Sequence, residues 1–288
     1  MHNNNYLKLI FLISKVLINI YFIGGVILNF SYKLGIDIGS TTIKLVVLDN
    51  DNQVVYKKYM RHLSEIYKSM HDNMILLSDT LKNHKFTCAI TGSAGMGMAN
   101  NLNMPFVQEV IACSKAVKNW IPQTDVAVEL GGEDAKITYF GSAPEQRMNG
   151  VCAGGTGSFI DHMASLLNTD AMGLNELAQK GTQIYTIASR CGVFAKTDVQ
   201  ALLNDGVSKA DIALSILQAV VNQTIGNLAQ GRPLEGNIAF LGGPLYFLTQ
   251  LKERFIKTLK LTDEHIVNVD DGCYFVAMGC ALSIMRLK

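Results

Sequence analysis

Hydrophobic residues alternate with other residues where the regular part of the chain begins, and this pattern predicts a β-hairpin. Leu34, Ile36 and Ile38 follow the two-residue period of a strand, and an apolar, β-branched run follows over residues 43–48. A third strand is expected over residues 54–61. The chain therefore starts its folded part with a small antiparallel sheet.

Helical spacing appears next. Apolar residues three and four positions apart predict helices over residues 64–83 and 110–120, and a short strand is expected between them over residues 87–91. The strand ends in Gly92-Ser93-Ala94-Gly95, a turn-forming sequence. This order of elements is typical of an α/β domain.

The same pattern then starts again. Strands are expected over residues 126–130 and 135–140, around a glycine-rich turn, which repeats the opening hairpin. The later part of the chain predicts one more strand over residues 237–241 and helices over residues 157–167, 173–180, 197–204, 209–229, 248–259 and 273–286. We interpret the repeat as a duplicated α/β unit with a cleft between its halves.

These elements define the expected domains. Domain I covers residues 32–124, with residues 272–288 packing back on it as a C-terminal helix, and domain II covers residues 125–271. Residues 1–31 form an apolar extension whose longest uncharged run, residues 16–32, is 17 residues long. A spanning helix needs about 20. We therefore favour an extension outside the fold over a membrane anchor at residues 7–30, and expect a cytoplasmic protein.

Composition narrows the functional classes. The 288 residues carry a formal net charge of +1, which gives no electrostatic footprint for nucleic acid. Six cysteines are present without a C-x-x-C pair, so a zinc ribbon or a thioredoxin motif is not supported. His62, His71 and His84 are interpreted as surface or packing residues rather than ligands.

The glycine-rich turns are the first chemical signal. Glycines bring the backbone close to a phosphate, and hydroxyls and amide groups can donate to it. Asp37, at a strand end, could hold Mg²⁺ through water. A plain hairpin remains an alternative for the first turn alone, but three strand-to-glycine turns occur, and neither a Walker A nor a G-x-G-x-x-G sequence does. The residues concerned are Gly39, Ser40, Thr41, Thr42 and Lys44; Gly131, Gly132, Glu133, Asp134 and Lys136; and Gly242 and Gly243.

This ordered set resembles the phosphate-1, phosphate-2 and adenosine motifs of the actin/Hsp70/sugar-kinase superfamily, a ribonuclease H-like fold with duplicated domains and an inter-domain nucleotide cleft. The resemblance implies Asp37 and Asp134 near Mg²⁺ or its waters. It also implies phosphate contacts for residues 39–42 and for Gly131 and Gly132, with Gly242 and Gly243 beside the adenosine.

Two cysteines stand apart from the other four. Cys152 and Cys191 each lie in a glycine-flanked segment just before a predicted helix, and helix N-termini favour negative charge. A four-iron cluster needs four thiolates, so this pair would supply half, and a twofold dimer would supply the rest. Two buried structural cysteines are the alternative reading.

The segments around these cysteines, residues 149–159 and 189–198, resemble the cluster segments of the activators of 2-hydroxyacyl-CoA dehydratases, a group that includes the ATPase subunits of benzoyl-CoA reductase. The closest likeness is to the first module of long activases, and it runs over residues 32–287. Short activators more often carry Gln where Glu133 stands, and another sequence where Pro244 and Leu245 stand.

This second resemblance implies an ATPase that passes an electron from a [4Fe-4S] cluster, held by Cys152 and Cys191 of a homodimer, to a dehydratase-type iron–sulfur partner. It implies ATP/ADP and Mg²⁺ as cofactors and a low-potential reductant such as ferredoxin or flavodoxin. Catalytic roles fall on Asp37, Glu133 and Asp134, and cofactor contacts extend to Lys44, Lys136, Gly154, Gly155 and Thr156.

Three rival functions stay open on the sequence. A sugar or acetate kinase of the same fold would need a catalytic carboxylate and a substrate pocket but neither Cys152 nor Cys191. An ATP-gated binding module would hydrolyse ATP slowly and hold no cluster. A membrane-attached sensor would require the first thirty residues to be a real anchor.

Overall fold

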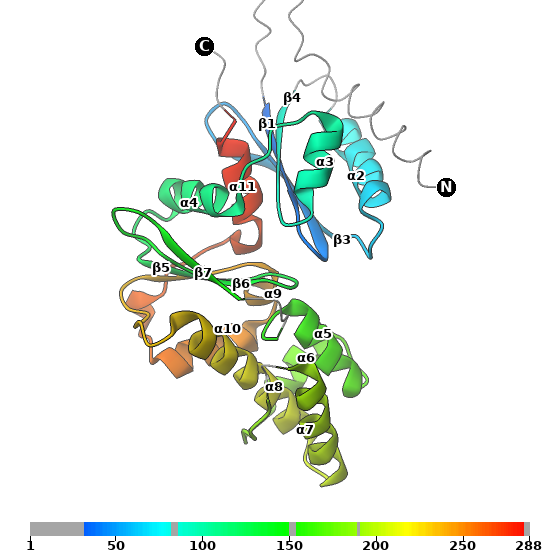
Figure 1. Cartoon of the computed structure of the whole chain (residues 1–288), viewed down its shortest axis with the longest axis vertical. Helices are drawn as coiled ribbons and strands as arrows, with labels where there is room; N and C mark the ends of the chain where they lie inside the picture. The colour runs from blue at the N-terminus through cyan, green and yellow to red at the C-terminus, as the bar shows by residue number, and fades with distance from the viewer. Residues whose placement is uncertain (1–31, 82–85, 150–153, 189–190, 285–288) are drawn as a thin grey trace, which may run out of the picture. The chain divides into compact units, whose positions relative to one another are not determined.

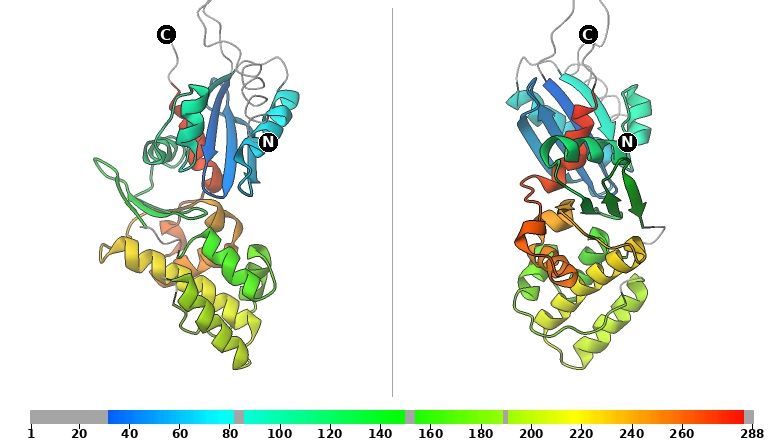
Figure 2. Two further views of the ribbon diagram at one scale, coloured as in Figure 1. Left: turned by 45° about the vertical axis from the view of Figure 1, so that its right-hand side comes forward. Right: turned by 90° about the vertical axis from the view of Figure 1, so that its left-hand side faces the viewer.

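The computed structural model describes residues 32–81, 86–149, 154–188 and 191–284. The chain divides into two compact units: unit 1 comprises Met1–Trp120 and Tyr274–Lys288, and unit 2 comprises Ile121–Cys273. Each unit is described below by itself (Figures 1 and 2). The apolar segment at residues 1–31 and Cys152 lie outside the described residues.

Unit 1 is built on a sheet of four strands: β1 (Tyr32–Ile38), β2 (Thr42–Leu48), β3 (Val54–Arg61) and β4 (Phe86–Thr91). The strand order is β3-β2-β1-β4, with β1 antiparallel to β2 and parallel to β4. The apolar alternation of β1 places Leu34, Ile36 and Ile38 in one fully buried layer.

Four helices flank this sheet: α2 (Ile66–Thr80), α3 (Gly95–Leu102), α4 (Glu109–Trp120) and α11 (Phe275–Leu282). Met70 and Met74 of α2 and Met98 of α3 pack into the same hydrophobic layer as β1. Helix α11, drawn in red in Figure 1, packs against α4 and β1. A Cβ on Gly35 of β1 would lie 2.0 Å from the Ala277 carbonyl oxygen, so only glycine permits this approach.

Unit 2 repeats the sheet of unit 1. Its strands are β5 (Val126–Leu130), β6 (Ala135–Tyr139), β7 (Glu145–Met148) and β8 (Ile238–Leu241), in the order β7-β6-β5-β8. Strand β5 is antiparallel to β6 and parallel to β8. The two sheets therefore share one topology, position by position, which confirms the expected duplicated α/β architecture.

The helices of unit 2 are α5 (Gly157–Leu166), α6 (Ala171–Ala178), α7 (Gly192–Asn204), α8 (Lys209–Thr224), the π-helix η1 (Ile225–Ala229), α9 (Gly243–Phe247) and α10 (Thr249–Leu259). Two short 3₁₀ turns follow, η2 (Asp263–His265) and η3 (Gly272–Tyr274). Among the described residues, Lys209–Ala229 is the one helix long and apolar enough to cross a membrane, but 67% of that window is buried, as expected for the core helix of unit 2.

Most predicted elements are confirmed, and the departures have local reasons. Helix α3 and strand β7 were not expected, because α3 is short and contains two glycines, while the polar sequence of β7 belongs to an edge strand. The helix expected from residue 197 begins earlier, at Gly192, since Ala195 and Val199 form its buried side. The C-terminal helix begins at Phe275 after the 3₁₀ turn η3.

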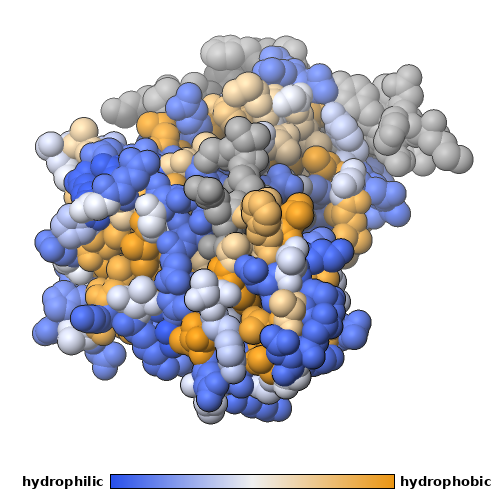
Figure 3. Space-filling model, turned by 60° about the horizontal axis from the view of Figure 1, so that its bottom comes forward, coloured by the Kyte–Doolittle hydropathy of each residue, from blue (hydrophilic) through white to orange (hydrophobic). Residues whose placement is uncertain are grey.

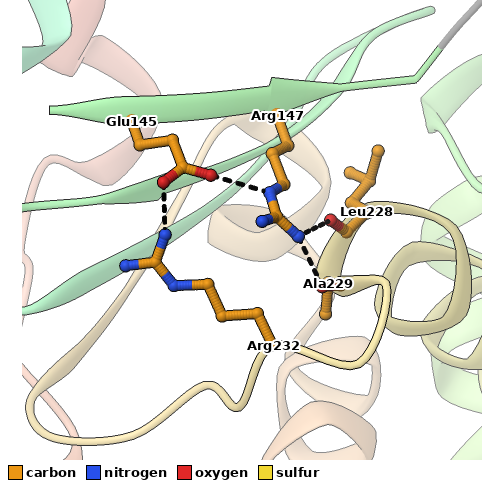
Figure 4. Close-up of polar contacts among 5 residues, drawn as sticks. All are labelled: Glu145, Arg147, Leu228, Ala229 and Arg232. Atoms are coloured by element: carbon orange, nitrogen blue, oxygen red, sulfur yellow. Dashed lines mark hydrogen bonds and ion pairs between the residues drawn. The ribbon is translucent and has the colours of Figure 1, made fainter.

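A polar cluster holds the edge strand β7 to the end of the core helix (Figure 4). The Arg147 Nε donates to Glu145 Oε1 at 3.0 Å, and Arg147 also donates to the Ala229 carbonyl at 2.6 Å. Arg232 donates to the other oxygen of Glu145 and lies over the Tyr139 ring, 3.8 Å from its centroid. These contacts satisfy carbonyl groups that a helix end leaves unpaired.

Candidate functional site

The turn of the first hairpin is a tight loop over Gly39, Ser40, Thr41 and Thr42. The Gly39 N–H donates to the Thr42 carbonyl at 2.9 Å, which closes the turn between β1 and β2. Gly39, Ser40 and Thr41 are partly exposed, whereas the Thr42 side chain is buried. Backbone amides and hydroxyls of a partly exposed glycine turn are suitable donors to a phosphate.

A partly buried ion pair lies at the base of this loop. Asp37 and Lys44 face each other in strand register, and the Lys44 Nζ donates to Asp37 Oδ2 at 3.0 Å. The other Asp37 oxygen lies beside Gly92, at the end of β4. Thr91, in register with Asp37, is fully buried, and its hydroxyl has no hydrogen-bond partner among the described residues. Carboxylate oxygens and a hydroxyl suit a hydrated Mg²⁺, so these residues fit the expected ion.

The second hairpin repeats this arrangement in unit 2. The Gly131 N–H donates to the Asp134 carbonyl at 2.7 Å, as Gly39 does to Thr42 in the first loop. Glu129 and Lys136 face each other in register at the base, with 3.8 Å between Nζ and Oε1. Glu129 therefore stands where unit 1 has Asp37, although the sequence had suggested no role for it.

The start of α5 is fixed on the second loop. The Gly157 N–H donates to the Gly131 carbonyl at 3.0 Å, and the Ser158 N–H donates to the Gly132 carbonyl at 2.7 Å. Thr156, the N-cap residue, is fully buried. The first two amide groups of α5 therefore donate to the loop, and these hydrogen bonds hold its backbone in place.

The turn after β8 packs against the end of β5 and the start of α5. Gly242 has φ 87° and ψ 163°, a backbone region that essentially only glycine occupies. A Cβ there would lie 2.0 Å from the Leu130 carbonyl oxygen, and one on Gly157 would lie 3.3 Å from Pro244 Cγ. Three segments far apart in the sequence, the second loop, the start of α5 and the turn after β8, therefore converge in unit 2.

Unit 1 carries the counterpart of this turn. Gly92 follows β4 as Gly242 follows β8, has φ 100°, and approaches the Ile38 carbonyl so closely that a Cβ would lie 2.2 Å from the oxygen. The equivalent glycine turns add to the evidence from the strands that the two units are duplicated.

Cys191 is the N-cap residue of α7, with extended backbone angles, and is half-buried. Two exposed hydrophobic side chains follow it after Gly192: Val193 is 72% exposed and Phe194 is 65% exposed. Hydrophobic side chains also gather in patches on the face drawn in Figure 3. Cysteine thiolates at helix N-termini are favoured in their charged form, so Cys191 fits the role of a ligand to an anionic cluster.

The segment leading to Cys191 is held by side-chain acceptors. Asp211 Oδ1 accepts from the Thr182 N–H at 2.7 Å and from the Gln183 N–H at 2.9 Å. These two bonds, with that from Ser208, hold the pKa of Asp211 below its ordinary value, the Gln183 bond contributing most. Asp198 Oδ2 accepts from the Ala188 N–H at 2.8 Å.

The other described cysteines are buried thiols. Cys88, Cys113, Cys273 and Cys280 are at most 4% exposed. Burial raises the pKa of Cys280 to about 12, and it raises that of Cys88 well above its ordinary value. Protonated thiols are poor ligands and nucleophiles, so the environment of these four cysteines supports a role in core packing.

The structure places the predicted site residues in two groups. Asp37, Lys44 and residues 39–42 lie together in unit 1. The remaining described ones lie in unit 2: Gly131, Gly132, Glu133, Asp134, Lys136, Gly154, Gly155, Thr156, Cys191, Gly242 and Gly243. Within the described residues no group of three or more His, Cys, Asp or Glu side chains forms a metal site. Their roles remain predictions.

Comparison with known proteins adds named relatives. The chain is 29% identical over 225 residues to the (R)-2-hydroxyglutaryl-CoA dehydratase activating ATPase of Acidaminococcus fermentans, a match that covers 74% of this chain and 82% of the relative.

Solved structures give the same result. The crystal structure of the Acidaminococcus fermentans (R)-2-hydroxyglutaryl-CoA dehydratase component A matches with a TM-score of 0.77 and 26% identity, covering 87% of this chain and 96% of that one. The activator of the 2-hydroxyisocaproyl-CoA dehydratase from Clostridium difficile, solved with bound ADPNP, has the same fold, with a TM-score of 0.72, 23% identity, and coverage of 87% and 93%.

The family model described as the BadF/BadG/BcrA/BcrD ATPase family matches residues 34–282, nearly all of the two units. This match agrees with the duplicated sheets, the paired glycine loops and the relatives named above. The chain belongs to the BadF/BadG/BcrA/BcrD ATPase family.

Proposed function

We propose that this protein is an ATP-dependent activase that delivers an electron to a 2-hydroxyacyl-CoA dehydratase-type iron–sulfur partner. The observation that carries the proposal is the position of Cys191, half-buried at the N-terminus of an exposed helix, in a chain whose paired loops are those of an ATPase family. A kinase or a binding module of this fold has no need of such a thiol.

The two hairpin loops are proposed to serve the phosphates. Ser40, Thr41 and Thr42 would donate from backbone amides or hydroxyls, and Gly132 would donate from its amide. Gly39 and Gly131, whose N–H groups close their turns, would let the backbone approach the phosphates closely. Asp37 and Asp134 would orient water molecules on Mg²⁺, and Glu133, which is exposed, would position the attacking water. Gly154, Gly155 and Thr156, which directly precede α5, would also contact the nucleotide, and Gly242 and Gly243 would contact its adenosine.

Cys191, together with Cys152, is proposed to ligate one [4Fe-4S] cluster shared by two copies of the chain. Such a cluster accepts and donates one electron at a potential set by its surroundings. The positive end of α7 stabilises the negative charge of the thiolate at Cys191. Lys196, on an exposed part of the same helix, adds positive charge nearby.

Helix α7 also supports the proposed homodimer. It buries only Ala195 and Val199 within its own unit, while Val193 and Phe194 are exposed directly beside Cys191. Exposed hydrophobic side chains that adjoin a shared ligand would be covered when two copies meet around it. The dimer would then bury the surface that the single chain leaves in water.

The remaining partners follow from this chemistry. A ferredoxin or flavodoxin would supply the electron, and the acyl-CoA dehydratase partner would receive it. The relatives named above are activators of dehydratases for two different hydroxyacyl-CoA substrates. We propose a cytoplasmic location, where thiolate ligands stay reduced.

Anaerobic iron–sulfur reconstitution of cysteine variants tests the proposal. Cys152→Ser and Cys191→Ser are each expected to keep MgATP binding and to lose bound iron and sulfide, because each removes two of the four thiolates of the dimer. Cys113→Ser, a buried cysteine of α4, is the matched control and should bind iron as the unaltered protein does. Full iron content in Cys191→Ser would refute the ligand assignment.

A further inference from the structure

A buried histidine contacts the first glycine loop from outside the motif. His62 follows β3 and is 4% exposed. Its Nε2 lies 3.1 Å from the Gly39 carbonyl oxygen, and its own N–H donates to the Thr41 carbonyl at 3.2 Å. One residue thus contacts two carbonyls of the loop.

The hydrogen bonds of the imidazole define its tautomer. The Ser64 N–H donates to His62 Nδ1 at 3.1 Å, so Nδ1 is an acceptor and carries no proton. The proton of the neutral ring is therefore on Nε2, and Nε2 donates to the Gly39 carbonyl. Each ring nitrogen has one definite role.

The turn that follows His62 has an energetically unfavourable backbone conformation. Leu63 has φ 46° and Ser64 has φ 65°, two consecutive non-glycine residues in the left-handed region. The Glu65 N–H donates to the His62 carbonyl at 2.7 Å and closes the turn. Such a conformation persists only where the surrounding contacts fix it.

The corresponding carbonyl of unit 2 is also held. The Gly131 carbonyl, equivalent to that of Gly39, accepts from the Gly157 N–H at 3.0 Å. In unit 2 the first amide of α5 therefore holds the loop carbonyl, whereas in unit 1 a histidine side chain holds it. Two different solutions at equivalent places indicate that the direction of this carbonyl matters to the loop.

We propose that His62 is a positioning residue of the nucleotide site. In a planar trans peptide the C=O and the following N–H point in opposite directions. The hydrogen bond to the Gly39 carbonyl consequently fixes the Ser40 N–H on the side of the loop away from His62. His62 presets the donor geometry for a phosphate without touching the nucleotide, an inference that rests on the proposed use of residues 39–42 as phosphate donors.

Two conservative substitutions distinguish the roles of the two ring nitrogens of His62. In His62→Gln the terminal amide can still donate to Gly39, whereas in His62→Asn the shorter amide keeps the acceptor for Ser64 and loses the contact with Gly39. We expect His62→Asn to weaken MgADP binding about 3- to 10-fold and His62→Gln to stay within about twofold of the unaltered protein. The ATPase KM should rise in His62→Asn while kcat changes less.

Isothermal titration with MgADP on the full chain checks this, with His71→Ala as the matched histidine control on α2. Asp37→Asn is included as a variant of the proposed site itself. Weaker binding in Asp37→Asn with unchanged binding in His62→Asn would overturn the inference alone. Equal loss in His62→Gln and His62→Asn would also overturn it. Unchanged binding in both Asp37→Asn and His62→Asn would overturn the proposed nucleotide site as well.

Discussion

At the scale of single residues, the conformation of the loops is determined by glycines and by the hydrogen-bonding groups around them. Gly92 and Gly242 end equivalent strands and lie against equivalent carbonyls, those of Ile38 and Leu130. The glycine motifs could be recognised in the sequence because they combine with flanking strands. His62 could not, because its role depends on a turn with two left-handed residues that no local pattern indicates.

Gly242→Ala is expected to destabilise unit 2 by more than about 3 kcal/mol, because strain in a glycine-only backbone region adds to a clash with the backbone of β5. Gly206→Ala is the matched control, since its φ of 77° is similar but nothing lies within 4 Å of its added Cβ. The control should cost about 1 to 2 kcal/mol. Urea unfolding measures both, and equal losses would show that the approach to Leu130 is unimportant.

At the scale of elements, the strands were the easier part to predict. Strands β3 and β5 were predicted with their observed bounds, and β2 and β6 within one residue, because apolar alternation and glycine turns mark their ends. Helix α3 and strand β7 were missed, since α3 is short and contains two glycines, which lower helix propensity, and the polar edge strand lacks a hydrophobic alternation. Tertiary contacts stabilise both.

The segment over residues 181–188, which has no regular secondary structure, is held by acceptors from distant elements. Asp211→Ala should free the Thr182 and Gln183 amides, so that their hydrogen–deuterium exchange accelerates by about tenfold or more. Asp205→Ala, at an exposed aspartate that ends α7, is the matched control and should change nothing there. Unchanged protection in Asp211→Ala would mean that other contacts hold the segment that leads to Cys191.

The same contact gives a pH dependence with a definite sign. The pKa of Asp211 is lowered in the folded state, so its contribution to stability is complete above the ordinary value of 3.8. That contribution is lost as the pH falls through the folded-state pKa. Exchange at Thr182 and Gln183 should therefore accelerate selectively, beyond the intrinsic pH effect, only in the acidic range and not between pH 5 and 8.

At the scale of the whole molecule, the fold of an ATPase family carries the cysteine that is proposed to ligate a shared redox centre. The fold class follows from the repeated hairpins and the family from the segments around Cys152 and Cys191, and the comparisons confirm both. The oligomer cannot be read from one chain, because the ligands that complete the cluster would come from a second copy. Exposed Val193 and Phe194 beside Cys191 are the physical reason to expect that copy.

Native mass spectrometry of the anaerobically reconstituted protein tests the shared centre most directly. We expect a species of two chains carrying four iron and four sulfide ions, about two irons per chain. Cys191→Ser should yield no iron-bearing dimer. A single chain holding its own four-iron cluster, or a metal-free monomer after full reconstitution, would contradict a cluster shared by two chains.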